Sequence, residues 1–154
     1  MSSQSELMRS PNLIPVKQFS IFADNKVGRL NDIVSMLSTK DIHIMALATV
    51  DTTDSSIVRI IVDYWEEARK LFRQHRISFS LNDMVVAEMA TENDIRQVTC
   101  SMVQAEINIH YTYPMLIRPR GKYALVMRTE DNDMATDILN SNGINTLMHS
   151  DIAR

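Results

Sequence analysis

The chain has 154 residues, of which 45% are hydrophobic and 23% are charged, which predicts a globular protein with a substantial apolar core. Its formal net charge of -3 argues against a nucleic-acid or membrane surface built on positive charge, and it has no run of about 18 apolar residues. The first residues lack the basic start and apolar stretch of a signal peptide. We therefore expect a cytoplasmic protein whose partners are small molecules or proteins.

The N-terminal half predicts one β-α-β-β-α-β series. Residues 1–16 have no hydrophobic period and predict a flexible arm, although Leu13, Ile14 and Val16 could dock as an edge segment. Alternating or helical apolar periods then predict strands at 19–23, 42–50, 57–62 and 77–81 and helices at 27–37 and 63–75. Val27, Leu30 and Val34 fall on the predicted buried face of the first helix. Asp63 and Glu66 have the spacing of a capping box for the second.

The same order recurs in the C-terminal half. Strands are predicted at 84–89, 107–113, 123–127 and 144–148, and helices at 95–105 and 135–142, the last closed by Gly143. Cys100 is expected to be a small core residue of the first of these helices. Matching apolar positions lie 65 to 68 residues apart, which indicates two copies of one unit, 17–82 and 83–150. The predicted fold class is α+β, with two tandem ferredoxin-like βαββαβ units, each an antiparallel sheet with two helices on one face.

The junction from Asp24 to Leu30 holds one of only three glycines in the chain, Gly28. A glycine in the first turn of a helix that follows a strand leaves no Cβ over the unpaired N–H groups, which can then meet a carboxylate. The alternative interpretation is a tight strand-to-helix turn without a ligand. The junction alone leaves both interpretations open.

Several runs of the sequence resemble those of ACT domains: IFADNKVGRL and DIHIMALATVDTTDSSIVRIIVD in the first half, and EINIHYTYPM and GKYALVMRTED in the second. The resemblance implies a small stand-alone protein made of two ACT domains, which usually hold an amino acid between two copies. Three departures are visible. Val27 stands where the family pattern has proline before the glycine, and Ser55-Ser56 stands where relatives more often have a glycine before the third strand. The predicted alignment of the repeats puts Arg96 in the place of Gly28, so either the second copy lacks an equivalent site or the Arg96 guanidinium itself binds a carboxylate.

The predicted ligand-binding residues are Asp24, Asn25, Lys26, Val27, Gly28 and Leu30, with Tyr111 and Tyr113 as candidates from a facing strand. Free N–H groups near residues 25–28 would hold the ligand carboxylate, and Asn25 and Asp24 would receive its ammonium group. No catalytic residue, cofactor or metal ligand is predicted, because the sequence holds no nucleophile or phosphate-loop motif and its four histidines lack ligand spacing.

The resemblance and the residues together favour a non-enzymatic amino-acid sensor. The rival hypothesis is a degenerate ACT pair that binds no ligand and serves as an oligomerisation or protein-interaction module. We expect a homodimer, because each small unit leaves one sheet face and its edges unprotected. A regulated enzyme or a transcription factor is the expected further partner.

Overall fold

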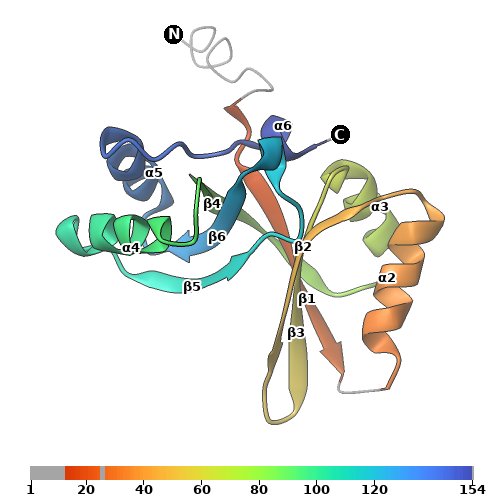
Figure 1. Ribbon diagram of the computed structural model, residues 1–154. Helices are drawn as coiled ribbons and strands as arrows, with labels where there is room; N and C mark the ends of the chain where they lie inside the picture. Colours follow the sequence, from red (N-terminus) through yellow and green to blue (C-terminus); the bar gives the residue numbers. More distant parts are fainter. Residues whose placement is uncertain (1–12, 25–26, 154) are drawn as a thin grey trace, which may run out of the picture. The chain divides into compact units, whose positions relative to one another are not determined.

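The structure is a computed structural model that describes residues 13–24 and 27–153. The chain divides into two compact units. The first unit is Lys17–Asn82, and the second is Asp83–Ile152 together with residues 13–16 (Figure 1). Both combine helices with antiparallel strands, so the predicted α+β class is confirmed.

The first unit has the predicted β-α-β-β-α-β order. Its elements are β1 (Val16–Asp24), α2 (Arg29–Thr39), β2 (Ile44–Asp51), β3 (Ser55–Val62), α3 (Trp65–Gln74) and the first residues of β4 (Phe79–Met89). The strands lie in the order β2-β3-β1-β4, and β3 runs antiparallel to both β2 and β1. A hydrogen bond of 2.7 Å from the Thr52 hydroxyl to the Ser55 carbonyl closes the β2–β3 hairpin.

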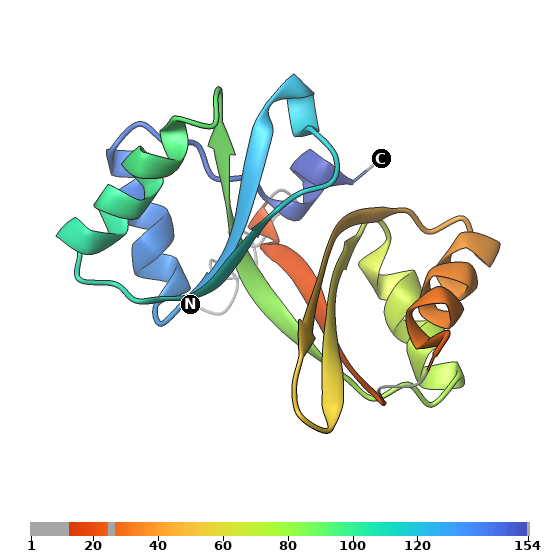
Figure 2. The same ribbon diagram turned by 60° about the horizontal axis from the view of Figure 1, so that its bottom comes forward.

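Two helices cover one face of the first sheet, where the core of this unit lies (Figure 2). Three phenylalanines form its centre. The ring of Phe19 on β1 lies 5.1 Å from that of Phe72 on α3 and 5.3 Å from that of Phe79 on β4. From α2 only Ile33 and Leu37 are buried, so this helix contacts the core through a narrow stripe.

The second unit repeats this order with a weaker last strand. It contains the end of β4, α4 (Asp94–Gln104), β5 (Ile109–Pro114), η2 (Pro119–Gly121), β6 (Tyr123–Thr129), α5 (Asn132–Ser141) and α6 (His149–Ile152). The strand order is β4-β6-β5. The predicted strand at 144–148 is reduced to isolated bridges, Ala87 with Thr146 and Pro15 with Met148, and α6 was not predicted. The predicted arm, 1–16, lies mostly outside the described residues, but Ile14 accepts a hydrogen bond from the His149 amide.

The helix ends show the repeat at the level of single hydrogen bonds. The Ile42 amide donates to the Leu37 carbonyl at 3.0 Å, and the Ile107 amide donates to the Met102 carbonyl at 2.9 Å. Each of α2, α3, α4 and α5 is followed by a residue with positive φ: Asp41, Arg76, Glu106 and Gly143. Gly143 therefore ends α5 as predicted.

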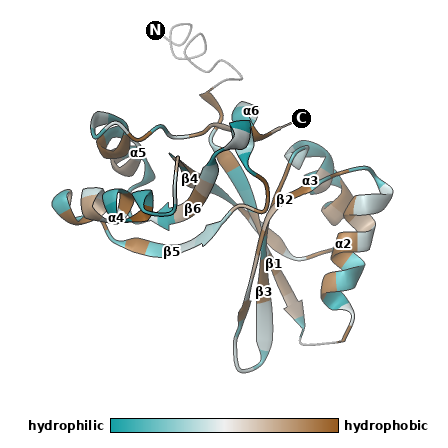
Figure 3. Cartoon of the chain, in the orientation of Figure 1, coloured by the Kyte–Doolittle hydropathy of each residue, from teal (hydrophilic) through white to brown (hydrophobic). Residues whose placement is uncertain are grey.

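Three local predictions are wrong. The N-cap of α3 is Tyr64, and the Asp63 carboxylate instead accepts the amides of Tyr64 and His43, so no capping box forms. Cys100 is exposed, because it lies about 200° around α4 from the buried Val98. Val27 precedes α2 and is fully exposed, and Leu30 is 38% exposed. Apolar and polar residues accordingly alternate along α2 in Figure 3.

Candidate functional site

Gly28 is the N-cap of α2 and has a left-handed backbone, with φ 88° and ψ -5°. Its carbonyl accepts the Asp32 amide at 2.9 Å, and no side chain in the described part of the chain caps the helix. A Cβ at this position would meet no atom within 4 Å. Glycine is therefore favoured by the backbone conformation and not by crowding. Because glycine has no Cβ, it also places no side chain over the first N–H groups of α2.

A groove of about 840 Å³ lies beside Gly28, between the first turns of α2, the end of β1 and the β2–β3 hairpin. Its apolar wall includes Val27, Leu30 and Val34. The groove thus brings together four of the residues predicted from the sequence: Asp24, Val27, Gly28 and Leu30. Asn25 and Lys26 lie outside the described residues, and the ligand-binding role of the whole set stays a prediction.

The hairpin supplies polar groups that the sequence reasoning missed. Thr49, Asp51 and Ser56 line the groove opposite α2. Asp51 pairs with Ser56 across the hairpin, and the neighbouring Ser55 pairs with Asp24 of β1. The predicted hairpin alone does not show this, because it pairs the end of β2 with the start of β3, and only the further pairing of β3 with β1 brings these residues to the end of β1. The groove therefore holds two carboxylates, Asp24 and Asp51, near a helix N-terminus.

Tyr111 and Tyr113 lie on β5 of the second unit, with parallel rings whose centroids are 6.4 Å apart. They are paired with Arg128 and Val126 of β6. The groove beside Gly28 is lined by residues of the first unit. A contribution of the two tyrosines to a ligand site therefore stays a prediction.

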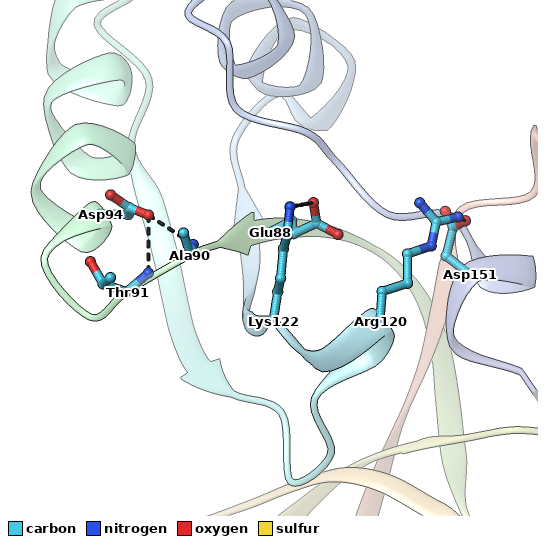
Figure 4. A network of polar contacts seen from close by, with 7 residues as sticks. All are labelled: Glu88, Ala90, Thr91, Asp94, Arg120, Lys122 and Asp151. Atoms are coloured by element: carbon cyan, nitrogen blue, oxygen red, sulfur yellow. Dashed lines mark hydrogen bonds and ion pairs between the residues drawn. The ribbon is translucent and has the colours of Figure 1, made fainter.

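In the second unit, the loop between β4 and α4 is equivalent to the Gly28 junction, and the side chain of Asp94 hydrogen-bonds to its backbone. The Asp94 carboxylate accepts the Ala90 amide at 2.8 Å and the Thr91 amide at 3.2 Å (Figure 4). The N-cap of α4 is Asn93, which has an ordinary right-handed backbone. The predicted alignment of Arg96 with Gly28 is therefore wrong, because Arg96 is the third residue of α4 and Asn93 occupies the equivalent position.

Three basic side chains of the second unit contact other side chains of that unit. Arg120 forms an ion pair with Asp151 of α6, and Lys122 lies 3.5 Å from the Glu88 carboxylate (Figure 4). The guanidinium of Arg118 stacks over the ring of Tyr123 at 4.2 Å. Within 13–24 and 27–153, no three histidine, cysteine or acidic side chains are grouped to hold a metal ion. No helix in the same ranges is long and apolar enough to cross a membrane.

Comparison with known proteins gives a clear family and a shared fold. A family model described as an ACT domain pair matches residues 14–154. Protein BT0572 from Bacteroides thetaiotaomicron is similar in structure, with a TM-score of 0.83, 24% identity, and coverage of 93% of this chain and 99% of that one. The ligand-free regulatory subunit of aspartate kinase from Thermus thermophilus has a TM-score of 0.59 and 12% identity, and the match covers 84% of this chain and 93% of that one. No curated protein sequence matches the chain.

Proposed function

Because this chain belongs to the ACT domain pair family, we propose that it is a non-enzymatic regulatory protein that binds an amino acid in the groove beside Gly28. The proposal rests on one observation: three kinds of chemical group line the same groove. An uncapped helix N-terminus, two carboxylates and an exposed apolar wall lie around one hollow. These match the carboxylate, the ammonium group and the side chain of an amino acid.

In this proposal the N–H groups of the first turn of α2 hold the ligand carboxylate, because they lack acceptors within the helix and the helix dipole favours an anion there. Asp24 and Asp51 receive the ammonium group. Val27, Leu30 and Val34 contact the ligand side chain, which favours an apolar amino acid.

We expect one such site in each chain. In the second unit the Asp94 carboxylate already accepts two amides of the equivalent loop, and no glycine opens the helix start. A ligand carboxylate there would face the negative charge of Asp94. Of the two proposed ACT domains, 17–82 would therefore bind the ligand and 83–150 would not.

Val27 and Leu30 are exposed apolar residues at the groove, so we propose that a second chain covers them in a homodimer. We propose that Tyr111 and Tyr113 of that second chain supply a further wall of the site. The similarity to the regulatory subunit of aspartate kinase supports a role as the regulatory subunit of a cytoplasmic enzyme. The alternative is a protein-interaction module that binds no ligand. The exposed Val27 and Leu30 would then serve the interface alone.

The test is a thermal-shift panel of the twenty amino acids on the wild type, Gly28→Val and Gly143→Val. Gly143 also has positive φ and open space around its Cβ position, but it lies outside the groove, so it is a matched control. A ligand at about 100 times its Kd adds roughly 2.7 kcal/mol to the free energy of unfolding. We expect a shift with one or a few amino acids that Gly28→Val abolishes and Gly143→Val retains. A flat panel that calorimetry confirms would favour the interaction module.

A further inference from the structure

A second cavity of about 540 Å³ lies in the first unit, on the other flank of α2. It opens between α2 and the C-terminal end of α3, next to the end of β1 and residues 77 and 78. Its lining includes the apolar Ile21, Ile33 and Ile77. The volume is in the range of small-molecule sites. Every described residue that lines it belongs to the first unit.

The cavity is also lined by two arginines whose charges are weakly neutralised. Arg29 lies 3.8 Å from the Asp24 carboxylate, and both side chains are at least half exposed, so this ion pair is weak. The Arg76 guanidinium has no ion pair or hydrogen bond with the described residues. His75 is held at the same edge by the contact of its Nδ1 with the Leu71 carbonyl, at 3.0 Å.

We propose that this cavity binds a small monocarboxylate with a short apolar chain. The guanidinium groups of Arg29 and Arg76 meet the carboxylate, because guanidinium forms strong charge-assisted hydrogen bonds with it. The chain lies against the isoleucine side chains. Asp32 also lines the cavity and disfavours a ligand with a second negative charge. This inference does not depend on amino-acid binding in the groove beside Gly28.

The second unit indicates which residue can replace Arg76, because Gly143 occupies the equivalent turn there. The Arg76 amide donates to the Arg73 carbonyl at 3.2 Å, and in the equivalent turn the Gly143 amide donates to the Asn140 carbonyl at 3.1 Å. Both residues have positive φ, 54° and 81°. Since glycine adopts this conformation more readily than arginine, Arg76→Gly removes the guanidinium while retaining or raising the melting temperature.

The probe is 3-methylbutanoate, titrated into the isotope-labelled full chain and followed by amide NMR shifts. The readout has to resolve single residues, because Asp24 and Arg29 line both the cavity and the groove. We expect saturable shifts at Met36, His75 and Ile77, which line the cavity alone, and not at Val34, Thr49 and Ser56, which line the groove alone. Equal binding of the neutral 3-methylbutanamide, or shifts confined to the groove residues, would overturn the proposal.

Variants complete the test. We expect Arg76→Gly and Arg29→Gln each to raise the Kd for 3-methylbutanoate at least fivefold. The control is Arg73→Ala, which removes an exposed arginine of α3 that does not line the cavity, and it should leave the Kd within twofold. An equal loss in Arg73→Ala would show that bulk charge causes the binding, and unchanged binding in both cavity variants would also refute the site. Arg29→Gln tests the site independently if Arg76→Gly fails to fold.

Discussion

The backbone amide of His43 donates a hydrogen bond of 2.9 Å to the Asp63 carboxylate, and the second unit repeats this contact between Asn108 and Glu130, also at 2.9 Å. The reverse backbone bonds, from the Asp63 amide to the His43 carbonyl and from the Glu130 amide to the Asn108 carbonyl, measure 3.2 and 3.1 Å. An acidic side chain after the third strand of each unit thus fixes the start of the second strand. The repeat extends to a side-chain contact between different residue types.

Asp63 should contribute more to stability than Glu130. Asp63 is 1% exposed and also accepts the Tyr64 amide at 2.9 Å, whereas Glu130 is exposed. Asp63→Ala removes a buried carboxylate and leaves two part-buried amides without a charged acceptor, so we expect it to lower the free energy of unfolding by about 2–4 kcal/mol. Glu130→Ala should cost less than about 1 kcal/mol, because water replaces an exposed acceptor. Urea unfolding measures both, and equal losses would contradict this assignment.

Gly28→Ala and Gly143→Ala should destabilise the protein to a similar degree. Both glycines have positive φ, and a Cβ at either position would meet no atom within 4 Å. The cost is therefore that of the left-handed backbone alone, about 1–2 kcal/mol for each substitution. Thermal unfolding followed by circular dichroism checks this. A much larger loss for Gly28→Ala would indicate a steric contact that the structure does not contain.

Asp94→Ala should loosen the loop between β4 and α4 without unfolding the second unit. The substitution removes the acceptor of the Ala90 and Thr91 amides in an exposed loop, so we expect a cost of about 1 kcal/mol. Hydrogen exchange at these two amides should accelerate several-fold. Exchange at Ile60 in the core of the first unit should not change, and faster exchange there would mean that the substitution acts globally.

The sequence predicted the order of elements and the family, because hydrophobic periods depend on which faces are buried. The errors arose where a local sequence pattern allowed more than one structural arrangement. Asp63 had the spacing of a helix cap, but its carboxylate accepts a hydrogen bond from the His43 amide just before β2. The two residues are 20 positions apart in the sequence, so no local pattern shows this contact. The alignment of Gly28 with Arg96 failed because apolar residues recur every three or four positions, so a shift of three still matches.

The sequence predicted only one side of the groove, because the other side depends on strand pairing. Gly28 could be found from the sequence, since glycine is rare in this chain and stands at a strand-to-helix junction. Thr49, Asp51 and Ser56 lie more than 20 residues away, and only the pairing of β3 with both β1 and β2 brings them to the same end of the sheet. The apolar wall was misassigned to the core, because the helical period gives a direction but not the width of the buried stripe.

If a second chain covers the groove, exposed apolar residues there should control self-association. Val27 is fully exposed and Leu30 is 38% exposed, and burying either side chain in an interface contributes about 1.5–3 kcal/mol. We therefore expect Val27→Asp and Leu30→Glu each to weaken dimerisation at least tenfold in sedimentation equilibrium, since a factor of ten corresponds to about 1.4 kcal/mol. Val103→Asp is the matched control, because Val103 is an exposed valine on α4 of the second unit. A wild type that stays monomeric at high micromolar concentration would refute the proposed dimer, and an equal effect of Val103→Asp would place its interface elsewhere.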